Sequence, residues 1–567
     1  MGTWTSRARF TGRASLLALL LAACGSGSRT SGPPASRDLD LANPAHATPG
    51  RATGSIAAAT PSQPDHRVEP PAPVGPIAPV TPVAPPAPVL PPPGPTLELM
   101  KWGADTRSFQ LRSSEAVYAQ PDSTSTALGK IVVGTRLPLA GAAVGVGRDC
   151  KAWLAVLPAG WICARRVKPS PEPPVAAVLP EVPAGALLPQ KYYGVTKGGQ
   201  RFKDADAVLA GIPLPEPKAK SSYMVTKGDV VDVDGVSYIT TGVGLVAADD
   251  LYEYHPSQLA GIDLVATPPP AWPFAWVTGK TSKALTIRAE PVKKAAEAGT
   301  VTLRQVVPVL EEKDGYVRIG DAQWLPRTSV QIARKRTRPT IDGVAGTEPS
   351  EGRWIDVDRD DQVMIAYDHD LPVYATLVSS GHNKKDTPPA LYRIRSKAAV
   401  TKMAAEEREA SHYEVSEVPW ATRFRSGLYF HAAYWHDDFG TARSHGCVNL
   451  APRDAKWVYD WTAPTMPPGW SELEVPMAGA MIVRVYDVAH VDPPVFDYKK
   501  EAVERVKVRK REAQLKKARE AAEAAAAAGE VDPATPTTIP TAPAAPAAPP
   551  PAVPAPTVAA PTVAPSP

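Results

Sequence analysis

Short runs in which apolar and polar residues alternate begin near residue 101 and fill the middle of the chain. A period of two places every second side chain on one face, which is typical of half-buried β-strands. Proline-rich or polar linkers interrupt these runs at 169–185, 266–273 and 334–352. The pattern predicts a mostly β protein, in which several small units precede one larger segment at 353–487.

A repeat emerges when the ends of three small units are aligned. Residues 161–167, 245–251 and 324–330 each have two apolar residues, four mixed residues and one apolar residue. The first and third units also share an opening, the end of a predicted strand followed by a turn-forming proline, at 117–121 and 287–291. Such self-similarity indicates repeated β units, with the middle copy lacking the opening.

The repeated units resemble bacterial SH3-like barrels. The resemblance covers 101–168 and 274–333, and a degenerate copy is expected at 186–262. In that family the barrels usually bind cell-wall peptide or glycan. Spacers that pack against a neighbouring domain are the alternative.

Two proline-rich stretches cannot belong to a core. Of the 66 prolines in 567 residues, 19 fall in 31–100 and 13 in 531–567. Proline fixes φ and removes a backbone donor, so a disordered stalk and a disordered tail (529–567) are expected. Residues 498–528 contain no proline and no glycine, and they are rich in Ala, Glu, Lys and Arg, which predicts a basic helix. A solvated helix is favoured over one that lies against an anionic polymer or lipid.

The net charge of +4 is concentrated at two places. Three arginines precede residue 14, and residues 499–520 hold ten Lys or Arg against four acids. The rest of the chain is mildly acidic. This distribution excludes the basic face that nucleic-acid binding requires.

The N-terminus is typical of an exported protein. Residues 1–23 combine a basic start with an apolar run too short to span a bilayer, which indicates a signal peptide. Cys24 follows small residues and precedes a Gly/Ser stretch, and this resembles the lipobox of bacterial lipoproteins. The resemblance implies a lipid on Cys24, a tether at 24–100, and anchoring to the membrane of the cell envelope, in the periplasm at the outer membrane. An ordinary signal peptide is the alternative.

Three further cysteines remain. Cys150 and Cys163 lie close together in one β-rich unit, and export permits a disulfide between them. Cys447 is then unpaired, either as a reactive thiol or as a buried inert one.

The segment around Cys447 carries a motif. His431 lies 16 residues before Cys447, which is preceded by Ser444-His445-Gly446 and followed by Val448-Asn449. This arrangement resembles the catalytic signature of the L,D-transpeptidase (YkuD) family, and weaker matches at 354–367, 378–394 and 418–424 extend it to about a quarter of the chain. Two departures are Ala390, where glycine is usual, and Ala432, where Gly or Ser usually follows the histidine.

The resemblance implies a YkuD-type β-sandwich at 353–487 and a cysteine-dependent peptidoglycan transpeptidase. Its substrates would be stem peptides: Cys447 would release D-alanine from a tetrapeptide, form a thioester, and pass the acyl group to an amine. No cofactor is implied, and carbapenem-type inhibitors would bind. His431 would be the base and His445 would hold the loop or position substrate. Supporting roles fall to Ser444, Gly446, Asn449 and the Ala432 carbonyl, and candidate substrate contacts, with core packing as the alternative, are Trp420, Tyr434, Trp435 and His436.

Elementary chemistry agrees with these roles. A free thiol is only slightly ionised near neutral pH, so a nucleophilic cysteine needs an adjacent base such as imidazole. A zinc site would use the same residue types, but neither CxxC nor HExxH spacing is present, and no metal is expected. Papain-like enzymes place their cysteine before their histidine, whereas His431 and His445 both precede Cys447. The remaining alternative is a wall-binding lipoprotein with a vestigial thiol domain.

Overall fold

The computed structural model describes residues 103–527. Excepted are 139–140, 145–149, 197, 215–221, 227, 280–283, 340–351, 383–384 and 405–412. The predicted signal peptide (1–23), the tether (24–100) with Cys24, and the tail (529–567) lie outside the described residues. Among the helices that are described, none is long and apolar enough to cross a membrane.

The first module, residues 108–170, consists of two small antiparallel sheets. Its elements are β1 (Ser108–Leu111), β2 (Glu115–Tyr118), β3 (Ala127–Ile131), β4 (Arg136–Leu137), β5 (Ala142–Val144), β6 (Ala152–Ala155), β7 (Trp161–Cys163), the 3₁₀ helix η1 (Ala164–Arg166) and β8 (Val167–Ser170). The strand orders are β4-β1-β8 and β3-β2-β7-β6-β5. Cys150 and Cys163 form a disulfide that packs on Trp153.

The third module, residues 274–333, repeats this arrangement strand for strand. Its elements are β17 (Phe274–Val277), β18 (Leu285–Arg288), β19 (Glu297–Val301), β20 (Val306–Pro308), β21 (Glu311–Lys313), β22 (Tyr316–Gly320), β23 (Gln323–Pro326), η3 (Arg327–Ser329) and β24 (Val330–Ala333). The orders β20-β17-β24 and β19-β18-β23-β22-β21 correspond to those of the first module. Its buried side chains, among them Val317, Leu325 and Ile332, form a core of their own.

The second module, residues 192–253, follows the same order with one replacement. Its elements are β9 (Tyr192–Val195), β10 (Arg201–Phe202), α1 (Ala205–Leu209), β11 (Ser222–Thr226), β12 (Val230–Val233), β13 (Val236–Thr241), β14 (Gly244–Ala247), η2 (Ala248–Asp250) and β15 (Leu251–Glu253). Its strand orders are β11-β9-β15 and β10-β14-β13-β12. The helix α1 therefore stands where the first module has β3 and the third has β19. Asp204 caps α1 by accepting the Ala207 N–H, which favours a helix there. The SH3-like nature of all three modules stays a prediction.

The main unit, residues 353–486, is built from two larger sheets and a helix. Its elements are β25 (Arg353–Asp358), β26 (Val363–Asp368), β27 (Leu371–Leu377), β28 (Ala390–Arg393), β29 (Ser396–Ala404), β30 (Tyr413–Arg425), β31 (Leu428–Ala432), β32 (Val448–Leu450), α2 (Pro452–Trp461), β33 (Trp470–Glu474) and β34 (Ile482–Tyr486). One sheet has the order β16-β27-β26-β25-β34-β28, in which β16 (Ile262–Asp263) comes from the linker before the third module. The other contains β30, β29 and β33, with β31 and β32 at its side.

The core of the main unit lies between its two sheets. Near-continuous apolar runs such as 363–367 are buried on both faces. Met364 and Ala366 share a cluster with residues of the other sheet and α2, and the alternate residues of the run belong to a second cluster. A buried ion pair between Arg484 and Asp356 (2.7 and 2.9 Å) crosses neighbouring strands β34 and β25. The site described below is therefore supported by two rigid sheets.

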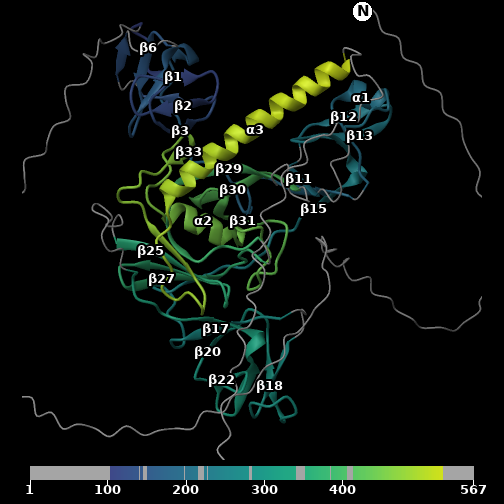
Figure 1. Ribbon diagram of the computed structural model, residues 1–567, viewed down its shortest axis with the longest axis vertical. Coiled ribbons are helices and arrows are strands. Elements are labelled where there is room, and N and C mark those ends of the chain that lie inside the picture. Colours follow the sequence, from purple (N-terminus) through teal and green to yellow (C-terminus); the bar gives the residue numbers. More distant parts are fainter. Residues whose placement is uncertain are drawn as a thin grey trace, which may run out of the picture.

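All three modules are attached to the main unit, which lies between the first and third modules (Figure 1). The first module joins through β3, which pairs antiparallel with β33, and its core is continuous with that of the main unit. The second joins through β11, which pairs parallel with β30. The third follows β16, which pairs with β27. The first two modules are thus docked on the main unit by backbone pairing, and the third packs side chains of its first and last strands against it, contacts that the sequence did not reveal.

A single long helix, α3 (Tyr498–Ala527), follows the main unit and projects away from it (Figure 1). Its first turn is anchored, because the Tyr498 hydroxyl donates to the Phe424 carbonyl at 2.6 Å and accepts the Arg393 N–H at 2.7 Å. From residue 509 to residue 522 every side chain is exposed. The sequence predicted a basic helix over 498–528; the anchored first turn is additional.

Candidate active site

Two neighbouring strands carry the candidate catalytic residues. β31 runs parallel to β32, and His431 is paired with Asn449. Cys447 directly precedes β32, so it lies beside Tyr429, two positions before His431 on the same strand. Because side chains alternate between faces, Cys447 and His431 are presented on one face of the sheet. The structure therefore brings together the histidine and the cysteine of the motif.

The Cys447 thiol is a free, half-buried group. Its Sγ lies 3.4 Å from the Gly427 carbonyl oxygen, in the turn between β30 and β31. Burial raises the pKa of the thiol to about 11, and a hydrogen bond from the Tyr429 N–H lowers it only in part. At neutral pH the resting side chain is therefore the neutral thiol.

His431 is buried and held in one orientation. Its Nδ1 lies 3.3 Å from the Ala432 carbonyl oxygen, and its ring stacks on Trp435 with 5.7 Å between centroids. An Nδ1–H that donates to this carbonyl leaves Nε2 as the acceptor. Burial lowers the pKa of His431 to about 4, so the imidazole is neutral near pH 7. A neutral imidazole is the form that can take a proton from a thiol.

The turn before Cys447 is stabilised by the side chain of Ser444, a residue of that turn. Ser444 Oγ donates to the Cys447 carbonyl and accepts the Gly446 N–H at 3.0 Å. Gly446 has φ +119°, and an added Cβ would lie 2.8 Å from Leu428. Glycine is favoured at this position because other residues rarely adopt this φ and because a Cβ would displace the Leu428 side chain. The fixed turn determines where the Cys447 backbone lies.

A second layer of residues supports this turn, and sequence reasoning gave none of them a role. Thr387 Oγ1 donates to the Gly446 carbonyl at 2.7 Å. The Ser380 carbonyl accepts the N–H groups of Arg443 and Ser444, both at 2.9 Å. Ser380 is itself held by the Gln362 amide, whose Oε1 accepts its N–H and whose Nε2 donates to its hydroxyl, each at 2.7 Å. The sequence signal was the weaker match at 378–394, which includes Thr387 and Ser380.

His436 and Asn449 form a polar contact beside the site. His436 Nε2 faces the Asn449 carboxamide at 3.1 Å, and its Nδ1 accepts the Asp438 N–H at 3.3 Å. Burial, the Arg443 charge and His431 lower the pKa of His436 to about 3. The sequence placed Asn449 in the turn; the structure shows its side chain reaching His436 as well.

Two of the candidate substrate contacts belong to the core instead. Trp420 is buried in the main core, and Tyr434 is fully buried with its ring stacked on Tyr192 of the second module at 3.8 Å. Neither can touch a bound peptide, so core packing is the correct reading for both. Trp435 is half-buried against His431 and stays a candidate contact.

His445 occupies the outer side of the turn. Its ring lies 4.9 Å from that of Tyr413, the first residue of β30. This contact fits a residue that holds the loop. Within the described part of the chain, no group of three or more His, Cys, Asp or Glu side chains is arranged to hold a metal ion.

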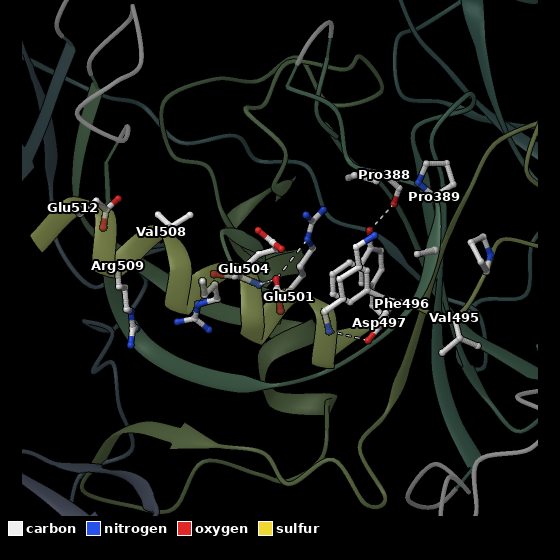
Figure 2. Close-up of a pocket in the computed structure, with 17 residues that line it drawn as sticks. Pro388, Pro389, Val495, Phe496, Asp497, Glu501, Glu504, Val508, Arg509 and Glu512 are labelled. Atoms are coloured by element: carbon white, nitrogen blue, oxygen red, sulfur yellow. Dashed lines mark hydrogen bonds and ion pairs between the residues drawn. The ribbon is translucent and has the colours of Figure 1, made fainter. Parts of the chain in front are cut away.

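A groove of about 690 Å³ borders the site, between the start of α3 and the main unit. Figure 2 shows Glu501, Glu504 and Arg509 on the helix, with Pro388 and Phe496 also lining the groove. Two of its lining residues, Pro388 and Ser426, each directly adjoin a residue that contacts the turn or thiol, Thr387 or Gly427. The groove is not lined by His431 or by residues 444–447, and it approaches the site only through these two neighbours.

The comparisons with known proteins concern this same region. Residues 352–477 match the model of the YkuD L,D-transpeptidase catalytic domain. The matched residues make up nearly the whole of the main unit, which is therefore similar to YkuD catalytic domains. A curated relative, the candidate L,D-transpeptidase YciB of Bacillus subtilis (strain 168), is 28% identical over 154 residues, which is 23% of this chain and 75% of that protein.

Solved structures match over the same fraction of the chain. The catalytic domain of the E. faecium L,D-transpeptidase is 22% identical and covers 24% of this chain and 98% of its own, with a TM-score of 0.20. L,D-transpeptidase 3 from Mycobacterium tuberculosis is 20% identical and covers 24% of this chain and 61% of its own, with a TM-score of 0.20.

Proposed function

We propose that this protein is a cysteine-dependent L,D-transpeptidase acting on peptidoglycan stem peptides. The observation that carries the proposal is the placement of Cys447 and a neutral His431 on one face of two paired strands, with Nδ1 of His431 oriented by the Ala432 carbonyl and Nε2 left to accept a proton. The family match of residues 352–477 supports the substrate class.

The first half of the reaction is acylation of Cys447. Sγ attacks the carbonyl carbon of the third stem residue while the thiol proton passes to His431 Nε2. The tetrahedral intermediate then collapses, the bond to the terminal D-alanine breaks, and the leaving amine takes the proton back from His431. A thioester and free D-alanine result.

The second half transfers the acyl group to an amine. The acceptor amine attacks the thioester, gives a proton to His431 and expels the thiolate, which recovers that proton. The acceptors would be a neighbouring stem, which gives a 3-3 crosslink, a free D-amino acid, or a protein side chain. Proton transfer must accompany attack, because a thiol with a pKa of about 11 does not ionise beforehand to an imidazole with a pKa of about 4.

Charge on the carbonyl oxygen needs a donor near Cys447. The Gly446 N–H is engaged by Ser444 Oγ, so we assign this role to the Cys447 N–H, which the closed turn positions. Gly446 contributes its small size and positive φ. This assignment refines the expectation that Gly446 itself takes part in oxyanion support.

The test is turnover of purified tetrapeptide muropeptides by the full chain and by Cys447→Ala. We expect 3-3 dimers and released D-alanine with the unchanged protein, and neither product with the variant. Formation of 3-3 dimers by Cys447→Ala would refute the proposal. His431→Gln, which keeps the size of the side chain but removes the base, should lose at least about a hundredfold in rate.

The proposed activity requires an extracytoplasmic location. The Cys150–Cys163 disulfide supports an oxidising compartment. We propose that Cys24 carries a lipid and anchors the chain to the envelope. Lipid labelling in growing cells should mark the unchanged protein and leave Cys24→Ala unlabelled; equal labelling of both would contradict it.

A further inference from the structure

The segment between the candidate base and the candidate nucleophile is a loop, residues 435–443, which we call the linking loop. It leaves β31 after His431 and returns to the Ser444 turn. Within it, an ion pair joins Arg443 to Asp438. The two strands pair with each other directly, and the loop is the covalent connection between them.

The third module holds this loop. The Arg304 guanidinium, in the turn between β19 and β20, donates to the Asp437 carbonyl at 2.8 Å and forms an ion pair with the Asp437 carboxylate. Gln331 Nε2, from β24, donates to the Gly440 carbonyl at 2.7 Å. Two side chains of one module thus bind two backbone carbonyls of the loop.

The loop and the module are also in close contact. Gly440 has φ +96°, and a Cβ added there would lie 3.1 Å from Thr278 and 3.3 Å from Gln331. On its other side, the Gly440 N–H donates to the Val378 carbonyl of the main unit at 2.9 Å. The loop is therefore clamped between the third module and the main unit.

The clamp reaches the catalytic strands through few atoms. Asp438, next to Asp437, donates its N–H to His436. His436 faces Asn449, which pairs with His431 across β31 and β32. A displacement of the loop at Asp437 would therefore be transmitted to His431 through His436 and Asn449.

We propose that Arg304 and Gln331 are positioning residues of the active site, so that the third module completes the catalytic domain rather than serving only as a wall-binding appendage. The proposal rests on the proposed acyl-transfer function of Cys447. Arg304 and Asp437 are both partly exposed, so their ion pair adds little to stability. Its contribution is geometric, and small displacements of reacting groups are costly in rate.

The experiment measures the second-order rate of Cys447 acylation by a carbapenem, together with the thermal midpoint, on the full chain. Arg304→Met and Gln331→Met keep side-chain length and remove the donors. We expect each to slow acylation by about tenfold and the double variant by more, with thermal midpoints close to the unchanged protein. Arg304→Lys, which keeps the charge and a donor, should recover part of the rate.

Arg318→Met is the matched control. Arg318 lies in the same module and forms an exposed ion pair with Glu311 at 3.0 Å, within that module. We expect it to acylate at the unchanged rate. Equal rates for Arg304→Met, the double variant and the unchanged protein would overturn the proposal. So would equal slowing by Arg318→Met, or by Arg304→Lys and Arg304→Met alike, because the effect would then not depend on the loop contacts. If the unchanged protein itself is not acylated, the proposed function fails, which is a distinguishable result.

Discussion

The first and third modules have the same strand order but differ in how they are attached. The first pairs its β3 with β33 of the main unit, and its core is continuous with the main core. The third has a core of its own, packs Phe274, Trp276 and Ala333 into a second buried cluster shared with the main unit, and adds polar side-chain contacts. Identical topology therefore supports two relations to the active site, one through a distant sheet edge and the other through the linking loop.

This difference shows that the role of a repeated unit depends on the surface it presents. At equivalent positions, Gly129 of the first module faces β33, whereas Gly299 of the third faces open space. The first module acts as an extension of a sheet. The third, through Arg304 and Gln331, reaches the loop beside Cys447.

The largest expected effect is on the first module. The Cys150–Cys163 disulfide closes a loop with a sequence separation of 13, and its loss should cost about 3 kcal/mol by releasing chain entropy in the unfolded state. Denaturant unfolding of Cys150→Ala/Cys163→Ala measures this. Because the first module attaches away from the site, the double variant should still be acylated by a carbapenem at the unchanged rate. A large drop in that rate would show that the first module, like the third, acts on the active site.

Docking of the third module depends on Asp361. This buried carboxylate of the main unit forms ion pairs with Arg327, at 2.6 Å, and Arg334, and accepts the Ile332 N–H at 3.1 Å. Asp361→Asn should cost about 2–3 kcal/mol, because two arginines lose their buried partner. Unlike loss of the disulfide, it should also slow acylation. Glu312 binds the same two arginines but is exposed, so Glu312→Gln is the control and should cost less than about 1 kcal/mol.

The two equivalent glycines give a direct comparison. A Cβ at Gly129 would lie 2.1 Å from the Glu472 carbonyl oxygen, whereas at Gly299 the nearest atom is 4.0 Å away. Gly129→Ala should be about 2 kcal/mol more destabilising than Gly299→Ala, since only the first variant forces β33 aside. Calorimetry of both variants tests this, and equal losses would argue against docking through β3.

The pH dependence of acylation should be the smallest effect. Burial disfavours the charged forms, which lowers the pKa of His431 to about 4 and raises that of Cys447 to about 11. The rate should therefore fall only as the pH drops through about 4, and change by less than about 10% between pH 8 and 5.5. A fall centred near pH 6.5 would mean that the imidazole is solvated. If docking of the third module keeps His431 away from water, Asp361→Asn should raise the pH at which the acylation rate falls.

Local patterns were readable from the sequence. The three aligned segments at 161–167, 245–251 and 324–330 all form a strand, a 3₁₀ turn and the start of another strand. The middle copy lacks the shared opening, and α1 takes the place of the strand that follows this opening in the other two modules. Proximity of His431 to Cys447 was indicated by the motif, whose spacing matches two adjacent parallel strands.

Long-range contacts were not readable. Trp420 and Tyr434 were candidate substrate contacts with core packing as the alternative, and Tyr434 is covered by Tyr192, which is far away in sequence. The pairing of β3 with β33, and the contact of Arg304 with Asp437, depend on how separate units meet. No periodicity within one unit encodes such contacts, so physical reasoning from sequence stops at the surface of each module.

The central claim is that Cys447 is a nucleophile activated by His431. The most direct test is the intact mass of the full chain after incubation with a carbapenem, compared with Cys447→Ala. The account predicts one covalent adduct per unchanged molecule and none on the variant. An unchanged protein without an adduct, or a variant that still carries one, would contradict it.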